Sequence, residues 1–247
     1  MENINDSYFN GHYKDIWKSI IPAELTTKEV DFILSYFGLK KGGKVLDMMC
    51  GYGRHAIALA RKGISVTAVD NLDEYIKEID RIAKDEHIPV KSVKADILHY
   101  ETGETYDLVL CMGNSLNFFD AHDVNQLLTN IHSHLKRPGH LLINTWSLAE
   151  IAIKSFAARS WDEVNGVKHI CDSKYLFHPT RIESNSIFLS PDGSMEKKKA
   201  VDYIFSVAEM ETLLKKAGFN LAEIFSIPGK KKFALGEPRA YIIAGKM

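Results

Sequence analysis

The stretch Val45-Leu46-Asp47-Met48-Met49-Cys50-Gly51-Tyr52-Gly53-Arg54-His55-Ala56 decides the fold, because it sets two glycines between an apolar run and a helical segment. Glycine lets the backbone turn tightly and approach a ligand closely, and a helix N-terminus presents unpaired N–H groups. We therefore expect a strand over 45–48, a loop that binds a nucleotide-like ligand, and a helix over 54–62.

An acidic residue, Asp70, closes the next expected strand, over 65–70, 19 residues after Gly51. A carboxylate at that point can accept hydrogen bonds from both hydroxyls of a ribose. The glycines alone do not choose the nucleotide, because Gly51, Gly53 and Ala56 also satisfy the dinucleotide-binding pattern G-x-G-x-x-A.

Asp47 favours a cationic cofactor. A carboxylate at the mouth of the loop would lie close to the pyrophosphate of NAD, and two anions in a low-dielectric cleft repel by several kcal/mol. S-adenosylmethionine has no phosphate, and its methionyl ammonium and sulfonium are positively charged. The aspartate therefore disfavours the dinucleotide and favours the sulfonium cofactor.

The order of elements indicates an α/β fold. Short apolar runs alternate with amphipathic helical stretches from Lys44 to Trp146, which is typical of repeated βαβ units and a parallel sheet. Further strands are expected over 90–94, 106–112 and 140–146, with helices over 72–86 and from Val124 to a stop at 137–139. A last helix over 207–217 precedes two strands near 220–227 and 239–244.

Two segments lie outside this alternation. A helical stripe near 30–37, closed by Gly38, predicts that residues 1–40 form a helical cap. Residues 157–204 alternate polar and apolar side chains around the turn at 191–193, which predicts an antiparallel β insertion. We therefore divide the chain into a cap, 1–40, and a domain, 41–247, that carries the insertion.

Composition narrows the class of protein. The 247 residues include 31 basic and 32 acidic side chains, a balance without the positive charge typical of dedicated nucleic-acid binders. No apolar run approaches the roughly 18 residues of a membrane span, and the first ten residues do not resemble a secretory signal. Three widely spaced cysteines favour free thiols. We expect a cytoplasmic protein that binds neither membrane nor nucleic acid, as a monomer or a homodimer.

Beyond the glycine loop, several motifs together resemble those of class I S-adenosylmethionine-dependent methyltransferases. The run over 45–53 resembles the family's first motif, 66–71 its acidic second motif, 94–97 its adenine segment, 106–115 its fourth strand and loop, and 134–139 the turn before its fifth strand. The resemblance implies a Rossmann-like sheet of seven strands in the order 3-2-1-4-5-7-6, with the seventh antiparallel. It also implies S-adenosyl-L-methionine as cofactor, held by Asp47, Cys50, Gly51, Gly53, Asp70, Asn71, Asp96, Ile97, Met112 and Gly113. In this set Asp96 would contact the exocyclic amine of the adenine and Ile97 its ring.

The Gly53-Arg54-His55 run and the insertion resemble a subgroup of small-molecule methyltransferases, in which the insertion covers the substrate. The resemblance implies a small acceptor, with an amine nitrogen expected ahead of an oxygen or a carbon. Two departures matter: Met48 and Met49 replace a pair such as Leu-Gly, and 114–119 lacks the N-P-P-Y type motif of nucleic-acid adenine methyltransferases. The alternatives are an NAD(P)-dependent oxidoreductase and a non-catalytic protein that binds S-adenosylmethionine.

Methyl transfer from a sulfonium requires mainly alignment and exclusion of water, so a dedicated base is optional. The catalytic candidates are His55, Asn114 and Tyr13, and the candidate substrate contacts are Tyr8, Tyr13, Trp17, Asn114, Ser115, Asn117, Trp146 and Arg181. For His55 a capping or packing role is the stronger interpretation, whereas cation binding and ordinary packing stay equally open for the aromatic residues of the cap. His132 and His134 would point apart on a helix, so we expect no metal site.

Overall fold

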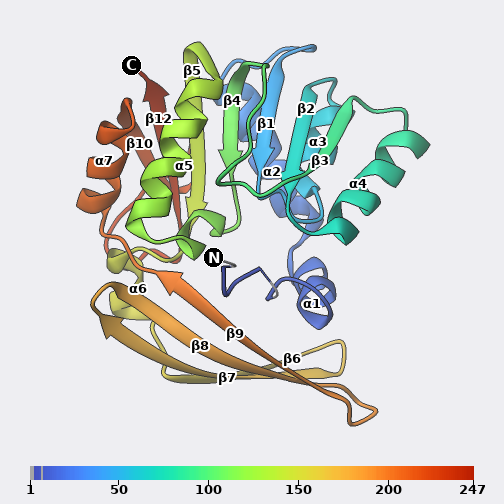
Figure 1. The fold of residues 1–247 in the computed structure, drawn as a ribbon, viewed down its shortest axis with the longest axis vertical. Coiled ribbons are helices and arrows are strands. Elements are labelled where there is room, and N and C mark those ends of the chain that lie inside the picture. The colour runs from blue at the N-terminus through green and yellow to red at the C-terminus, as the bar shows by residue number, and fades with distance from the viewer. Residues whose placement is uncertain (1–2, 7) are drawn as a thin grey trace.

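The central sheet has eight strands in the order β11-β10-β12-β5-β4-β1-β2-β3 in the computed structural model, which describes residues 3–6 and 8–247 (Figure 1). Its strands are β1 Lys44–Met48, β2 Ser65–Asp70, β3 Val90–Lys94, β4 Tyr106–Cys111, β5 Leu135–Thr145, β10 Phe219–Ile227, β11 Lys231–Lys232 and β12 Ala240–Lys246. The helices are α1 His12–Ile20, α2 Ala23–Tyr36, α3 Arg54–Arg61, α4 Asp73–Asp85, α5 Ala121–His134, α6 Ala149–Ser155 and α7 Val207–Lys216, with a 3-10 turn, η1, at Ser115–Phe118.

The predicted strand order is confirmed. Strands β3, β2, β1, β4 and β5 run parallel, and β12 pairs antiparallel with both β5 and β10, so β10 and β12 are the sixth and seventh strands of the expected order. The edge strand β11 was not predicted, because two residues show no periodicity. One expected boundary was wrong: α5 ends at His134, and β5 begins at Leu135, where it pairs with Tyr106 of β4, so the 137–139 turn lies inside the strand.

Helices cover both faces of the sheet, which explains the unbroken apolar runs of its central strands. Successive residues of a strand point to opposite faces, so in β1 Val45 packs under α2 and α3, while Leu46 packs under α5 and α7. Both residues are fully buried. The layers position the carboxyl ends of β1, β2, β3 and β4 along one edge, where ligands of open α/β sheets bind.

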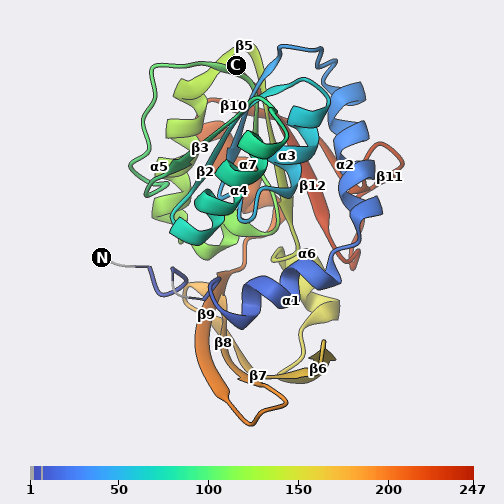
Figure 2. The same cartoon turned by 90° about the vertical axis from the view of Figure 1, so that its right-hand side faces the viewer.

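The insertion forms a second sheet below that edge, with the strands β6 Arg159–Val164, β7 Val167–Phe177, β8 Thr180–Leu189 and β9 Met195–Tyr203 in sequence order (Figures 1 and 2). All its pairs are antiparallel, so the expected antiparallel insertion after β5 is confirmed. Strand β6 and helix α6 were not predicted. Strand β6 is mostly exposed and has two acidic residues, so no clear alternation marks it in the sequence.

The cap contains two helices with different surroundings. Helix α2 buries Val30 and Ile33 against α3, as its stripe predicts. Helix α1 has no buried residue and lies between the insertion and the edge of the main sheet (Figure 2). The expected cap, 1–40, also includes Met1, Glu2 and Ser7, which lie outside the described residues.

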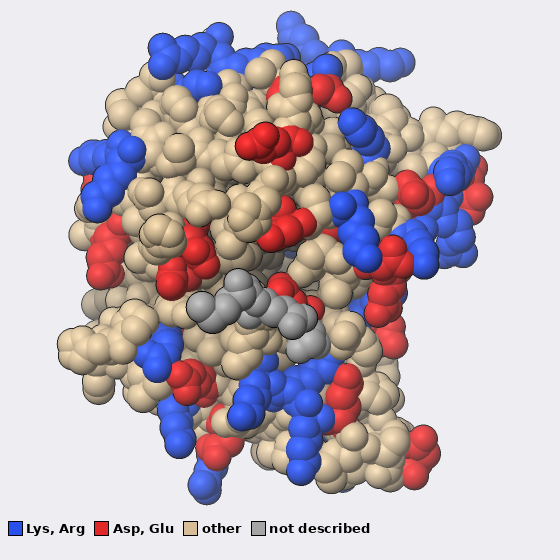
Figure 3. Space-filling view, viewed as in Figure 1, with Lys and Arg blue, Asp and Glu red and all other residues tan. Residues whose placement is uncertain are grey.

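Charged side chains of both signs are interspersed over the face drawn in Figure 3. No described helix is long and apolar enough to cross a membrane.

Buried amides join the main sheet to the insertion. Asn117 of η1 donates to the carbonyl oxygens of Ser147 at 3.0 Å and Tyr203 at 2.8 Å, and its own amide oxygen accepts from the Thr145 hydroxyl. Because Tyr203 is the last residue of β9, this side chain connects the end of β5 with the end of the insertion.

We expect Asn117→Ala to lower the free energy of unfolding by about 2–4 kcal/mol, because it leaves two buried carbonyl groups without a donor. Urea unfolding measures the change. The matched control is Asn185→Ala on the exposed side of β8, which should stay within about 0.5 kcal/mol of the wild type. A loss below about 1 kcal/mol for Asn117→Ala would contradict the role of this amide.

Candidate cofactor and acceptor site

A cavity of about 700 Å³ opens at the carboxyl edge of the main sheet, and loops after β1 to β4 and the start of the chain line it. All predicted cofactor residues except Gly53 line this cavity: Asp47, Cys50, Gly51, Asp70, Asn71, Asp96, Ile97, Met112 and Gly113. Residues that are up to 66 positions apart in the sequence are thus brought to one surface.

Gly53 shapes the loop from behind. It has a φ of 76° at the N-cap of α3, and a Cβ there would lie 2.7 Å from Cγ1 of Ile79 on α4. A larger residue would therefore strain the backbone and push α4 away from α3. Gly53 therefore allows α4 to pack closely against the start of α3, behind the loop.

Asp70 fixes the glycine loop and still faces the cavity. Its Oδ2 accepts from the Gly51 N–H at 2.8 Å, and its Oδ1 accepts from the Leu72 N–H at 3.0 Å. A carboxylate oxygen can accept more than one hydrogen bond, so Asp70 could also accept from a ribose hydroxyl in the cavity. Asp70 is only 8% exposed, and burial raises the pKa of its carboxyl above the ordinary value.

Asp47 carries an unpaired oxygen at the bottom of the cavity. The residue is 1% exposed, and among the described residues no donor reaches its buried Oδ2. Burial raises the pKa of this carboxyl to about 7, although the nearby Arg54 charge and the Ala56 N–H oppose the rise. A buried acceptor of this kind fits an ammonium group, such as that of the methionyl end of S-adenosylmethionine.

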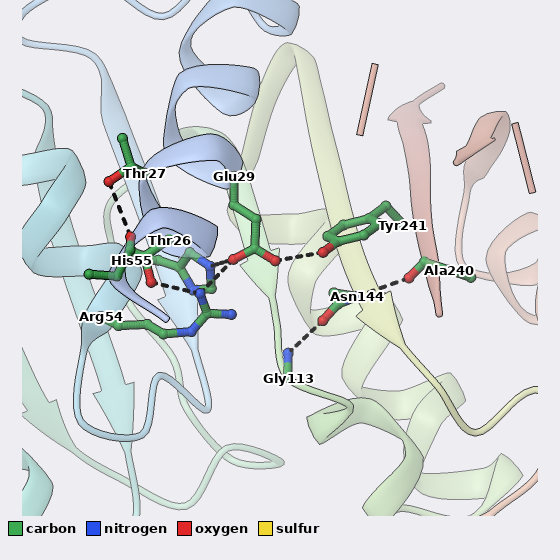
Figure 4. Close-up of polar contacts among 10 residues, drawn as sticks. Thr26, Thr27, Glu29, Arg54, His55, Gly113, Asn144, Ala240 and Tyr241 are labelled. Carbon is green, nitrogen blue, oxygen red and sulfur yellow. Dashed lines mark hydrogen bonds and ion pairs between the residues drawn. The ribbon is translucent and has the colours of Figure 1, made fainter. Parts of the chain in front are cut away.

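Three elements are joined by one buried carboxylate, Glu29 of α2 (Figure 4). Its Oε2 accepts from Nη1 of Arg54 at 2.5 Å and lies 2.9 Å from Nε2 of His55, while its Oε1 accepts from the Tyr241 hydroxyl at 2.6 Å. Burial alone would raise the pKa of Glu29, but the His55 hydrogen bond and the His55 and Arg54 charges lower it to about 2. The cluster binds α2 and β12 to the helix that follows the glycine loop.

The structure places His55 in this cluster. Its ring is 3% exposed and contacts the cavity, but Nε2 is engaged by Glu29 and burial lowers the pKa of the imidazole. The neighbouring Arg54 also lines the cavity, and the sequence interpretation did not single it out. The sequence feature that could have identified Arg54 is its position in the Gly53-Arg54-His55 run.

Aromatic residues of the cap close one side of the cavity. Phe9, Tyr13 and Trp17 line it, with Tyr13 and Trp17 stacked at a centroid distance of 6.0 Å. Trp146 lies outside the lining but contacts Trp17 at 5.5 Å. Tyr8 also lies outside it, with its hydroxyl 3.3 Å from that of Ser186 in the insertion. The cap residues Asn3, Asn5 and Asp6, which line the cavity too, were missed because polar loop residues show no periodicity.

Other candidates divide between the cavity and the scaffold. Ser115 lines the cavity, whereas Asn114 and Asn117 are fully buried and form hydrogen bonds with the scaffold. Arg181 contacts Glu183 and two carbonyl groups of the β7–β8 turn, outside the lining. The structure therefore gives these three residues scaffold contacts in place of a position at the cavity.

Asp96 lies at the cavity with its carboxylate partly engaged. One oxygen accepts from the Leu98 N–H at 3.0 Å, and the other lies 2.7 Å from Nδ1 of His99. Its contact with the exocyclic amine of an adenine, and that of Ile97 with the ring, stay predictions.

Comparison with known proteins identifies the family of the segment that forms this cavity. Residues 45–139, which contain the glycine loop and the four strands that bound the cavity, match the family described as a methyltransferase domain. The chain is a class I S-adenosylmethionine-dependent methyltransferase. Its methyl donor is S-adenosyl-L-methionine. The unpaired Oδ2 of Asp47 and the position of Asp70 at the cavity fit this ligand.

Curated relatives of this methyltransferase extend over different parts of the chain. A protein of Geobacillus sp. with a provisional methyltransferase name is 23% identical over 225 residues, which cover 89% of this chain and 87% of that protein. A ubiquinone biosynthesis O-methyltransferase of Rickettsia akari is 30% identical over 102 residues, 41% of this chain and 39% of that protein. The second match thus spans less than half of either protein.

Solved structures share the fold over nearly the whole methyltransferase. An S-adenosylmethionine-dependent methyltransferase from Clostridium acetobutylicum has a TM-score of 0.81 at 17% identity and covers 95% of this chain and 96% of its own. CalS10, an amino pentose methyltransferase from Micromonospora echinaspora, has a TM-score of 0.74 at 17% identity, with 96% and 98% covered. At these identities the likeness concerns the fold, including the insertion sheet.

The affinity for S-adenosylhomocysteine should rise roughly tenfold between pH 6 and pH 8. In the free protein about half of Asp47 is protonated near pH 7, and the ligand's ammonium favours the ionised carboxylate, so binding releases a proton below this pH. Titration calorimetry at several pH values measures the slope. Asp47→Asn should remove the rise, and a rise of equal size in that variant would contradict the assignment.

Proposed function

We propose that this methyltransferase transfers the methyl group to a small molecule, at an amine nitrogen. The observation that carries the proposal is the enclosure of the donor cavity by the cap, with aromatic faces on the acceptor side. When bound, S-adenosylmethionine supplies an electrophilic methyl group on a positively charged sulfur.

The cap closes the cavity through several contacts with the elements around the main sheet and with the insertion. Asn5 donates to the carbonyl oxygens of Phe118 and Val201 and accepts from the Val201 N–H at 2.9 Å, so it bridges η1 and β9. The Tyr75 hydroxyl donates to the Phe9 carbonyl at 2.6 Å from the other side. A cap held in this way covers the cavity of about 700 Å³ and would help to exclude water from a donor and a small acceptor bound there, which supports transfer to a small molecule.

The character of the lining supports an amine acceptor. The rings of Phe9, Tyr13 and Trp17 present faces that attract a cation, and Asp6 adds a carboxylate on the same side. Two basic side chains also line the cavity, and each has an acidic partner: Arg54 donates to Glu29 at 2.5 Å, and Nζ of Lys94 lies 3.7 Å from the carboxylate of Asp73. Similar proteins include an amino pentose methyltransferase and a ubiquinone biosynthesis O-methyltransferase, so the acceptor atom must be tested directly.

Donor binding should depend on Asp70. We expect Asp70→Ala to weaken binding of S-adenosylhomocysteine by about 1–3 kcal/mol, because the ribose loses hydrogen bonds to a charged group and the Gly51 N–H loses its acceptor. Calorimetry measures the affinity. Asp85→Ala at the exposed end of α4 is the control, and an unchanged affinity for Asp70→Ala would refute the role.

The acceptor class can be tested with donor that carries a tritiated methyl group. The enzyme is incubated separately with a metabolite extract below 1 kDa, with protein and with RNA. We expect the label in the metabolite fraction, in products that chromatography separates from the unreacted donor and that a cation exchanger retains at pH 7. Label found only in protein or RNA, or no label in any fraction, would overturn transfer to a small molecule, and label confined to uncharged products would overturn the amine.

A further inference from the structure

The outer face of the insertion sheet carries an exposed apolar row. Trp161 of β6 pairs directly with Ile170 of β7, and Ile170 pairs with Ile187 of β8. Directly opposite side chains on neighbouring strands lie within contact distance, so the three residues form one continuous surface. Leu189 and Met195 extend it in the next row. Trp161 is 69% exposed, Ile170 45% and Met195 58%. Exposed apolar residues that form a contiguous patch mark an interaction site, whereas single ones do not.

The row lies on the side of the sheet that points away from the cap. On the opposite side, Ser186 is buried and its hydroxyl lies 3.3 Å from that of Tyr8. Because successive residues of a strand point to opposite faces, its neighbour Ile187 points outward. An antiparallel sheet with one face in solvent normally presents polar residues on that face. The apolar outer face therefore indicates a surface that a partner covers.

The charges around the row have a two-fold pattern. On β6 a base, Arg159, and an acid, Glu163, stand two residues on either side of the tryptophan. On β7 a base, Lys168, and an acid, Asp172, stand two residues on either side of the isoleucine. A two-fold axis that crosses the strands through the row would place Arg159 of one copy opposite Glu163 of a second copy. The same rotation would place Lys168 opposite Asp172, so each base meets an acid.

The other simple face-to-face arrangement brings like charges together. A two-fold axis along the strands would place β6 of one copy over β9 of the other. Arg159 would then face Lys199, because these residues belong to one row of paired positions. With the axis across the strands, the like-charged contact is Lys197 with its own copy, at the rim on the edge strand β9, where a long side chain reaches water.

The outer face is large enough for a stable dimer. Strands about 4.8 Å apart with a rise of about 3.3 Å per residue give the four strands β6 to β9 a face of about 600 Å². Two copies would bury about 1,200 Å² in total, which is the lower end of the range for specific interfaces. Large aromatic residues such as Trp161 are among those that contribute most to affinity at such interfaces.

We propose that two copies of this methyltransferase form a homodimer through the outer faces of their insertions. The two-fold axis crosses the strands at the row of Trp161, Ile170 and Ile187. Packed sheets lie about 10 Å apart, so the apolar row of each copy is buried against that of the other. The inner face of the same sheet contacts the cap through Ser186, so the dimer supports the cover of the donor cavity in both copies. The dimer does not depend on which acceptor is methylated.

Sedimentation equilibrium of the full chain tests this assembly. We expect the wild type to form a dimer of 27.9 kDa chains with a dissociation constant of about 1 µM or below. Ile170→Lys should raise that constant roughly 100-fold or more, because each copy would bury an unpaired charge. The matched control is Ile153→Lys on α6, which replaces an apolar residue that is 72% exposed and lies outside the insertion sheet. It should dimerise like the wild type, and circular dichroism checks that both variants are folded.

An exchange of charges tests the position of the axis. Lys168→Glu and Asp172→Lys each create two like-charged contacts across the interface, so each variant alone should dimerise roughly tenfold more weakly than the wild type. In an equimolar mixture the exchanged charges are opposite again, so the heterodimer should be roughly tenfold tighter than either homodimer. Native mass spectrometry, with one variant carrying a longer tag, measures the three species.

A wild type that stays monomeric at about 100 µM would overturn the dimer, as would a dimer that Ile170→Lys leaves intact. Sedimentation of a monomeric wild type with vesicles of anionic phospholipid would assign the face to a membrane surface instead. A heterodimer that is no tighter than the homodimers would contradict the axis across the strands. If Ile170→Lys does not fold, the exchange of charges decides alone.

Discussion

The compensation of buried carboxylates determines how this methyltransferase is built. Glu29, Asp47, Asp70 and Asp202 all lie at or near the carboxyl edge of the sheet, where burial disfavours a negative charge. Glu29 is compensated within the fold by Arg54 and His55, and Asp70 by backbone N–H groups. Asp202 accepts hydrogen bonds from Asn114 and Ser147. Asp47 retains a buried oxygen, Oδ2, that the described residues leave without a donor and that the ammonium group of the methyl donor would compensate.

These two kinds of carboxylate respond to pH in opposite directions. The pKa of Glu29 is lowered, so its contribution to stability is present above its unfolded pKa and is lost as the pH falls toward 2. The pKa values of Asp47 and Asp202 are raised to about 7 and about 6, so the folded protein binds more protons than the unfolded chain and loses stability as the pH rises from about 4 to 7. A cationic ligand offsets that loss. At neutral pH, therefore, binding of a cationic ligand raises the stability of the folded protein.

The fold was largely predictable from the sequence because its strands are buried on both faces. Residues such as Val45 and Leu46 then form an unbroken apolar run, and the Gly51 loop marks the first strand-to-helix turn without ambiguity. The site residues at the carboxyl ends of these strands, Asp47 and Asp70, could be identified for the same reason. Strand β6 could not, because exposed strands that carry charged residues lack this signal.

The remaining site residues depend on contacts over long sequence distances. Asn114 occupies the place after β4 where a substrate contact is expected, but its amide is consumed by the ends of β5 and β9, 88 residues away in the case of Asp202. The chemical identity of a side chain does not show whether its partners are a ligand or the scaffold. In this protein the buried amides of Asn114 and Asn117 join the main sheet to the end of the insertion. Only the folded structure therefore shows that Asn114 and Asn117 bind the scaffold and not a ligand.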